Sequence, residues 1–265
     1  MSIIEAIIIA IVEGLTEFLP VSSTGHMILA QGFLGVESDE FVKAFTVIIQ
    51  FGAILSVLVL YWKRFFQSVK FYKILFMGFL PAAVIGFLAG DFIDTLLENV
   101  LVIAIMLVLG GIFMLFVDKW FTYPKETEPK MNYKHAVKIG LAQCIAMIPG
   151  VSRSMATIVG GMVQGFSRKT AAEFSFFLAV PTMAAASGYK FLGLLKDDAT
   201  RQILSENIDT LIIGNLVAFV VAMLAIKFFI NFLTKYGFKA FGYYRIIAGL
   251  TIIVLLMLGF NLEVA

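Results

Sequence analysis

The sequence predicts an all-α polytopic membrane protein in which two inverted repeats each begin with a re-entrant helical hairpin, the two tips meeting near the bilayer midplane. Hydrophobic residues make up 60% of the 265 residues and charged residues only 14%. Apolar runs of about 18 residues or more, the length of a membrane helix, recur along the chain. Two further apolar segments are interrupted by polar stretches that contain proline. We therefore treat residues 1–265 as one integral membrane domain.

Composition also excludes several classes of protein. The net charge is only +2, so no strongly basic face indicates a nucleic-acid partner. The single cysteine, Cys144, cannot form an internal disulfide. The first residues, "MSIIE", lack the basic region of a signal peptide, so we expect the chain to be inserted without cleavage.

Six stretches are long and apolar enough to cross a bilayer of about 30 Å. They are residues 41–62, 72–90, 98–118, 170–189, 208–231 and 245–262.

The interrupted segments are too short to span a membrane, and we interpret each as a re-entrant hairpin. Their halves are residues 3–12 and 27–36 around Pro20, and residues 135–148 and 155–166 around Pro149 and Gly150. Irregular backbone at membrane depth is tolerated only where it lines a protein-enclosed or wet cavity. Both breaks therefore mark candidate sites.

The two breaks are related by an internal repeat. With an offset of 129 residues, identical residues pair as Pro20/Pro149, Ser23/Ser152, Gly32/Gly161, Ser38/Ser167 and Phe45/Phe174. The order hairpin, span, span, span is the same in both halves. Paired interrupted helices in two halves are typical of a binding site at the repeat interface. We place repeat one at about 1–118, a cytoplasmic loop at about 119–134 and repeat two at about 135–265.

Charge bias predicts the orientation. The loops 62–73, 119–138 and 232–245 are basic, so the positive-inside rule makes them cytoplasmic. The stretch 90–100 is acidic, with Asp91, Asp94 and Glu98, and lies outside together with both termini. The loop 190–207 also falls outside, although it carries both lysine and acidic residues. Hairpin one then enters from outside and hairpin two from the cytoplasm.

Two acids lie inside the first hairpin. Glu13 and Glu17 are four residues apart and share one helix face. A charge at the bilayer centre costs about 2.5–3.5 kcal/mol even on the insertion scale, so such acids usually serve function. A divalent cation such as Mg²⁺ or Ca²⁺ would relieve this cost, because these ions prefer carboxylate oxygen. The alternative is a structural pairing with a base or a position near the surface.

The first break, "LPVSSTGH", combines hydroxyl groups with a histidine. Ser22, Ser23 and Thr24 suit the start of a helix, where free N–H groups bind anions. His26 follows Ser23 by three residues, on the same helical face. A serine within reach of a histidine is the pattern of a nucleophile and its base. Helix capping and an ordinary hydrogen-bonded histidine are the alternatives.

The second break, "PGVSRSMAT", repeats this design with an arginine. Gly150 permits close approach of the backbone to a ligand. Arg153 presents a planar fork of donors that suits phosphate. Alternatively, Arg153 forms an ion pair with Glu13 or Glu17 across the repeat interface. Substrate could then take the place of the carboxylate in that pair. The remaining candidate phosphate ligands are Ser152, Ser154 and Thr157.

These groups together indicate a metal-bound diphosphate. Helix N-termini and an arginine suit phosphate, whereas carboxylates suit it only through a bridging cation. A phosphate among lipid-facing helices indicates that the rest of the substrate is a lipid.

The motifs "EGLTEFLPVSSTGH" and "PGVSRSMAT" resemble the two signatures of the bacterial undecaprenyl-pyrophosphate phosphatase family, also called the bacitracin-resistance protein family. The resemblance implies hydrolysis of undecaprenyl diphosphate to undecaprenyl phosphate and phosphate in the plasma membrane, which recycles the carrier for peptidoglycan and other wall polymers. It implies a site that opens to the extracytoplasmic side and a divalent cation, Mg²⁺ or Ca²⁺, at Glu13 and Glu17. The residues expected to act in catalysis are Glu17, Ser23, His26 and Arg153. Those expected to bind phosphate are Ser22, Ser23, Thr24, Gly150, Ser152, Arg153, Ser154 and Thr157.

Several alternatives stay open on the sequence alone. The nucleophile is Ser23 or water, with His26 as general base, or His26 itself. The competing function is a secondary transporter or lipid flippase that uses the same midplane cavity. Membrane lipids surround the chain in either case. The preferred metal, the isoprenoid length and the oligomeric state, including a homodimer, are not fixed.

Overall fold

The computed structural model describes residues 1–66, 68–97, 99–121, 128–260 and 262, and every regular element in these ranges is a helix. The protein is thus an all-α polytopic membrane protein, as predicted. Six helices are long: α3 (Glu40–Leu60), α5 (Val69–Leu88), α7 (Val100–Trp120), α10 (Arg168–Leu194), α12 (Ile208–Tyr236) and α13 (Lys239–Met257). The others are α1 (Ile3–Thr16), α2 (Ser23–Leu34), α4 (Trp62–Phe65), α6 (Gly90–Leu97), α8 (Tyr133–Ile145), α9 (Arg153–Met162) and α11 (Asp198–Glu206).

The long helices coincide with the six predicted spans. Five of them, α3, α5, α7, α12 and α13, are each long and apolar enough to cross a membrane. The sixth candidate is α10 taken with α11, a pair bent by 106° at the short break between them. Two of these helices contain an internal proline without ending there, Pro81 in α5 and Pro181 in α10.

The boundaries of the last predicted span and its loop were wrong. The span was expected to begin at residue 245, but α13 begins at Lys239. The expected loop 232–245 is a tight turn, because α12 continues to Tyr236 and Gly237 follows with φ +72°. Glycine adopts such a positive-φ conformation readily, because it has no Cβ atom. Lysine at a helix end is tolerated because its long side chain extends to the water.

Other predicted loops are partly helical or fall partly outside the described residues. The first part of the acidic stretch 90–100 forms α6, and Glu98 is not described. The predicted loop 119–134 begins inside α7 and ends inside α8, and its residues 122–127, including Lys125, are not described.

Both predicted hairpins form, each as two short helices around a break. α1 has 14 residues and α8 has 13, so they are about 20 Å long at 1.5 Å per residue. Neither covers a hydrocarbon core of about 30 Å. Each of the two helices ends one turn before its proline, at Thr16 and at Ile145. The chain then turns and starts α2 or α9.

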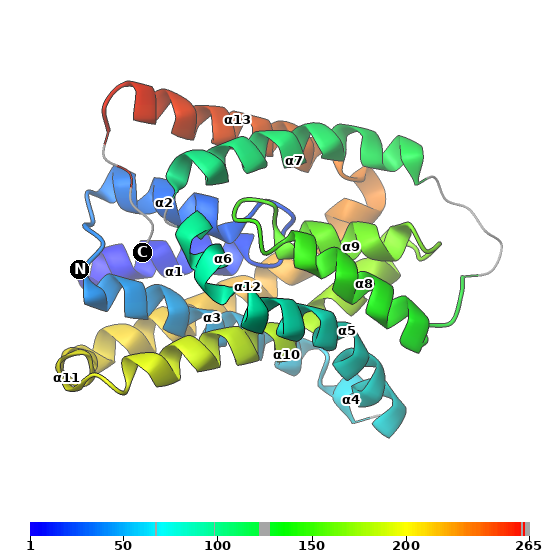
Figure 1. Ribbon diagram of the computed structural model, residues 1–265, viewed down its shortest axis with the longest axis horizontal. Coiled ribbons are helices and arrows are strands. Elements are labelled where there is room, and N and C mark those ends of the chain that lie inside the picture. Colours follow the sequence, from blue (N-terminus) through cyan, green and yellow to red (C-terminus); the bar gives the residue numbers. More distant parts are fainter. Residues whose placement is uncertain (67, 98, 122–127, 261, 263–265) are drawn as a thin grey trace.

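The hairpins pack against the opposite half of the chain. α1 lies along α12, and α8 lies along α5. Helix α3 contacts both α10 and α12, and α7 runs along α13. Figure 1 shows the α1–α2 hairpin extending from one end of the molecule and the α8–α9 hairpin from the other, with their breaks near the middle. The interdigitation brings residues about 130 positions apart into one site.

The two breaks share an unusual backbone conformation just before their second helices. Ser22 precedes α2 with φ +69°, and Ser152 precedes α9 with φ +80°. They are the only non-glycine residues with positive φ in the described chain. The shared conformation thus falls on Ser22 and Ser152, one position away from the Ser23/Ser152 pairing that the fixed offset of 129 gave, and the repeat itself stays a prediction.

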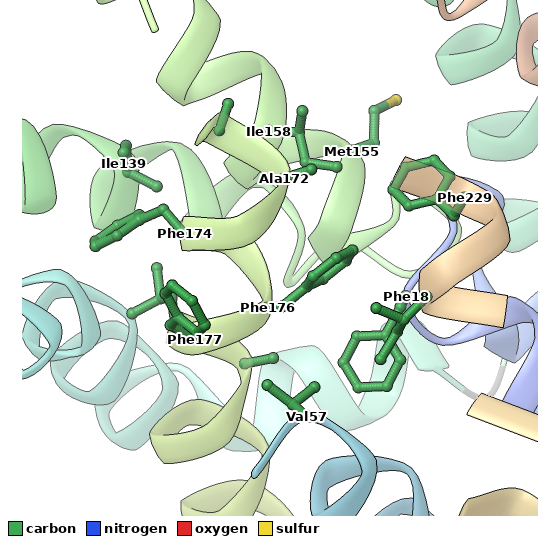
Figure 2. Packing of buried hydrophobic residues seen from close by; sticks show 14 of the residues in the cluster. Phe18, Val57, Ile139, Met155, Ile158, Ala172, Phe174, Phe176, Phe177 and Phe229 are labelled. Atoms are coloured by element: carbon green, nitrogen blue, oxygen red, sulfur yellow. The ribbon is translucent and has the colours of Figure 1, made fainter. Parts of the chain in front are cut away.

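Aromatic packing supports the first break from behind. The ring of Phe18, which directly follows Glu17, packs edge-on against Phe176 of α10 at 5.5 Å. Phe176 in turn contacts Phe229 of α12 at 6.0 Å. Figure 2 shows these three rings in the largest buried cluster. The break is thereby anchored to two helices of the second half.

Candidate active site

An ion pair joins the two hairpins. The Arg153 Nη2 atom lies 2.9 Å from Glu17 Oε1, and the two side chains are only 14% and 10% exposed. Glu17 sits at the C-terminal end of α1, whereas Arg153 is the first residue of α9. The pairing of Arg153 with a hairpin acid, one of the two roles foreseen for it, is thus present. A well-buried pair of this kind depends on both partners, because either charge alone would be poorly solvated.

Ser23 donates its hydroxyl hydrogen to the same carboxylate. Its Oγ atom lies 2.6 Å from Glu17 Oε2, so Glu17 binds a serine through one oxygen and an arginine through the other. Hydrogen bonds to a charged acceptor are short and strong. Glu17 is therefore the natural acceptor for the proton of Ser23.

Several groups orient Arg153 besides Glu17. It donates to the Ser175 carbonyl at 3.3 Å and to Met183 Sδ at 3.2 Å, both on α10. Its guanidinium carbon lies 5.6 Å from the centre of the Phe18 ring, within cation–π range. The Nε atom is buried without a partner. Arg153 is thus held in place by several contacts, and its Nε nitrogen has no hydrogen-bond partner within the protein.

Glu13 lies one helical turn before Glu17 and is fully buried. Neither of its carboxylate oxygens has a hydrogen-bond partner. A buried carboxylate without a partner is costly, which fits a group that receives a cation. No cluster of three or more acidic, histidine or cysteine side chains that could hold a metal occurs in the described ranges. A cation beside Glu13 and Glu17 would therefore take its other ligands from water or substrate phosphate, as Mg²⁺ commonly does.

His26 is hydrogen-bonded on both ring nitrogens. Nδ1 lies 2.8 Å from the Ser22 carbonyl, and Nε2 lies 2.8 Å from the Tyr244 hydroxyl. A carbonyl only accepts, so Nδ1 carries a hydrogen; in the neutral ring the Tyr244 hydroxyl then donates to Nε2. The expected Ser23–His26 hydrogen bond is absent among the described residues, because Ser23 bonds instead to the charged acceptor Glu17.

The hydroxyls of the second break are already engaged within the protein. Ser152 Oγ accepts from the Met155 amide at 3.3 Å and caps α9. Ser154 donates to the Leu19 carbonyl at 2.7 Å, and Thr157 shares a 2.6 Å hydrogen bond with Ser175. Both Ser154 and Thr157 are fully buried. These side chains hold the two breaks and α10 together, and their assignment as phosphate ligands stays a prediction.

The other predicted phosphate ligands lie at the breaks themselves. Ser22 is buried and forms no side-chain cap, whereas Thr24 is partly exposed in the first turn of α2. Gly150 has φ +89°, and a Cβ atom there would lie 2.4 Å from the Ile103 carbonyl oxygen. Glycine is required at this point by both conformation and space.

Sequence reasoning missed four residues around the site. Arg245 was counted among cytoplasmic loop charges, but it is fully buried in α13 and bonded to both breaks. An arginine directly followed by the apolar run "IIAGLTIIVLLML" was a signal for this burial. The others are Tyr244, which bonds to His26, and Ser175 and Met183, which contact Arg153.

The fold and the site together define a class: a multi-pass membrane protein with an acid, serine and arginine cluster where two broken hairpins meet. Such a cluster suits phosphate chemistry at membrane depth. The family model described as "Bacitracin resistance protein BacA" matches residues 6–254. The chain belongs to this family.

Curated relatives extend the match along the whole chain. An undecaprenyl-diphosphatase of Flavobacterium johnsoniae is 58% identical over 262 residues, covering 98% of this chain and 97% of its own length. One from Bdellovibrio bacteriovorus is 55% identical and covers 99% of each chain. One from Aquifex aeolicus is 44% identical, covering 93% of this chain and 95% of its own.

Proposed function

We propose that this protein hydrolyses undecaprenyl diphosphate to undecaprenyl phosphate and inorganic phosphate. The observation that carries the proposal is the Ser23–Glu17–Arg153 arrangement, in which a serine hydroxyl and an arginine share one buried carboxylate. It occurs in a chain 58% identical to a curated undecaprenyl-diphosphatase over nearly its full length. The activity would recycle the lipid carrier for peptidoglycan and other wall polymers, and would confer bacitracin resistance, as the family's name indicates.

The geometry favours Ser23 over His26 and water as the nucleophile. Ser23 Oγ would attack the terminal phosphorus while its proton passes to Glu17 at 2.6 Å. The bond from that phosphorus to the bridging oxygen would break, releasing undecaprenyl phosphate. Water would then hydrolyse the phosphoserine, restore the serine hydroxyl and release phosphate. His26, bonded on both nitrogens, would hold the Ser22 backbone beside the nucleophile.

Arg153 would exchange partners when substrate binds. Its Nη2 atom is bonded to Glu17 and its Nε atom is free. A diphosphate would compete for the guanidinium fork, which matches phosphate oxygens in pairs. Transfer of Arg153 to the phosphate would also free Glu17 to take the proton.

Glu13 and Glu17 would hold the divalent cation, Mg²⁺ or Ca²⁺. The unpartnered, fully buried oxygens of Glu13 support this assignment. A bound cation would neutralise negative charge on the phosphate oxygens. Without it, two carboxylates would repel the diphosphate that Arg153 attracts.

We further propose that the protein lies in the bacterial plasma membrane and that its site opens to the extracytoplasmic side. The two halves would be inverted repeats. The start of α1 and the end of α13 lie at one end of the molecule (Figure 1). At the opposite end lie α4, the end of α7, the start of α8 and the α12–α13 turn, which carry many of the basic residues, including Lys63, Arg64, Lys119 and Lys235. The positive-inside rule makes that end cytoplasmic.

The test is phosphate release from undecaprenyl diphosphate by purified protein in detergent, with Mg²⁺ or with chelator. Metal-dependent release that falls sharply in Ser23→Ala and Arg153→Ala variants is the expected result. Trapping a phosphorylated enzyme would locate the nucleophile, and an adduct on His26 would overturn the role of Ser23. A folded wild type that releases no phosphate with any metal would contradict the enzyme and favour the transporter or flippase.

A further inference from the structure

Arg245 is the largest fully buried side chain of the described protein, and it lies at the point where both breaks meet. It sits in α13 and was not part of either sequence motif. Its three guanidinium nitrogens donate to five backbone carbonyls: Pro20 at 3.1 Å, Val151 at 2.9 Å, Gly150 at 2.7 Å, Met106 at 3.2 Å and Leu107 at 3.4 Å.

The carbonyls belong to three separate parts of the chain. Pro20 lies in the first break, Gly150 and Val151 lie in the second, and Met106 and Leu107 lie in α7. A broken helix leaves carbonyl groups without their usual N–H partners, which is costly when they are buried. Arginine has five N–H donors in a rigid fork and can satisfy several such groups at once. Lysine, with one nitrogen, cannot do so in this geometry.

The surroundings are shaped for a guanidinium group. A Cβ atom at Gly110 of α7 would lie 2.3 Å from Arg245 Nη2 and 2.9 Å from its central carbon. No real Cβ atom tolerates such a distance, so glycine at 110 makes the room for Arg245. In the described chain no carboxylate lies within ion-pair distance of Arg245, so its hydrogen-bond partners are carbonyl groups only.

The other contacts between the two breaks are weaker, or must open when substrate binds. The Glu17–Arg153 pair must open for Arg153 to bind phosphate, as the proposed function requires. The Ser154–Leu19 hydrogen bond is a single neutral contact. Arg245 has all its donors on backbone and none directed to a ligand. It can therefore keep the breaks in place while Arg153 changes partners.

We infer that Arg245 is a positioning residue of the catalytic site, which holds both helix breaks in register so that Ser23, Glu17 and Arg153 converge on one phosphate. The inference rests on the proposed phosphatase function. It assigns Arg245 no contact with substrate. Loss of its bonds should therefore reduce turnover more than substrate binding.

The test compares Arg245→Lys and Gly110→Ala with wild type in the phosphate-release assay, with rates expressed per folded molecule. A displacement of about 1 Å can cost about 10²-fold in rate, so we expect kcat to fall by roughly 10- to 100-fold while KM changes little. Gly110→Ala keeps the arginine but occupies its space, so it tests the inference should Arg245→Lys fail to fold. Gly188→Ala is the matched control, because nothing lies within 4 Å of its Cβ position.

A second control separates positioning from general stability. Asp118 belongs to neither break. It accepts hydrogen bonds from Arg168 at 2.7 Å and from the Phe238 amide at 2.7 Å. Asp118→Asn should lower the melting temperature and leave kcat per folded molecule unchanged. Wild-type kcat in folded Arg245→Lys and Gly110→Ala would overturn the inference.

Hydrogen exchange gives a readout that does not need activity. Peptides covering residues 17–22 and 146–152 should exchange faster in both Arg245→Lys and Gly110→Ala, but not in Asp118→Asn. Unchanged exchange in both breaks would contradict the positioning role even if the wild type proved inactive. Inactive wild type with faster exchange in the variants would instead refute the phosphatase and retain the role of Arg245.

Discussion

Replacing Glu13 by glutamine should stabilise the metal-free protein. Both Glu13 oxygens are buried and without partners, and the residue is 0% exposed. An uncompensated buried charge costs several kcal/mol, whereas a neutral buried polar group without a partner costs about 1–3 kcal/mol. Glutamine has nearly the same shape, so Glu13→Gln should raise the free energy of unfolding by about 2 kcal/mol in chelator at alkaline pH, where the carboxyl group is ionised. The gain should be smaller at lower pH, because a buried acid escapes the cost of its charge by binding a proton.

The same substitution should remove the stabilisation by metal. A ligand at 100 times its Kd stabilises the folded state by about 2.7 kcal/mol. In a chain of this size, about 1 kcal/mol shifts Tm by about 2–4 °C, so saturating Mg²⁺ should raise the wild-type Tm by about 5–11 °C. Glu13→Gln should show little or none of this shift, because the carboxylate that receives the cation is gone.

The assay is thermal unfolding of purified protein in one detergent, with chelator and with Mg²⁺ or Ca²⁺. Glu40→Gln is a suitable control, because Glu40 is a well-exposed acid of α3 whose loss should leave the metal shift intact. A full metal shift in Glu13→Gln would refute the assignment of Glu13 as a ligand. A clear loss of stability in chelator would refute the reasoning about its unpartnered charge.

Four further substitutions test the site. Glu17→Gln removes the charged acceptor of the Ser23 hydroxyl. It should lower the rate of phosphate release by about 10²–10⁴-fold, the usual contribution of a general base. A rate within twofold of wild type would contradict this. Tyr244→Phe leaves the His26 Nε2 atom unpartnered and should reduce kcat about tenfold, equivalent to about 1.4 kcal/mol, with an altered pH–rate profile that a purely structural role would not produce. Ser22→Gly relieves positive φ without loss of a cap and should raise the free energy of unfolding by up to about 1 kcal/mol, measured by denaturation. Ser152→Gly should gain less, because that hydroxyl caps α9; an equal gain would argue against the strain at Ser22.

Local signals in the sequence were sufficient for the architecture. Proline breaks flanked by short apolar runs are visible in the chain itself, and they predicted both hairpins. The six spans follow from hydropathy, and all lie on long helices. The spacing of Glu13 and Glu17 identified the acidic face, because the helix period is a local property.

Contacts between the halves could not be obtained in this way. The Arg245–Pro20 bond connects residues 225 positions apart, and the Arg153–Glu17 bond connects residues 136 apart. Their partners depend on the interdigitated packing, which hydropathy does not encode. The hydrogen bond of Ser23 illustrates the point. Both Glu17 and His26 are near Ser23 in the sequence, and only the folded site shows that Glu17 is the acceptor.

The arrangement divides the site chemically between the halves. The first hairpin supplies the acids and the serine, while the second supplies Arg153, and each half carries groups that would be poorly compensated alone. Because the hairpins pack on the opposite halves, folding itself brings the charges together. The Glu17–Arg153 pair then stabilises the empty site with the same atoms that the reaction requires, so binding of a diphosphate must replace one buried pairing with another. Such an exchange is feasible only if the backbone around it stays fixed, and this is the role that Arg245 fulfils from the last helix.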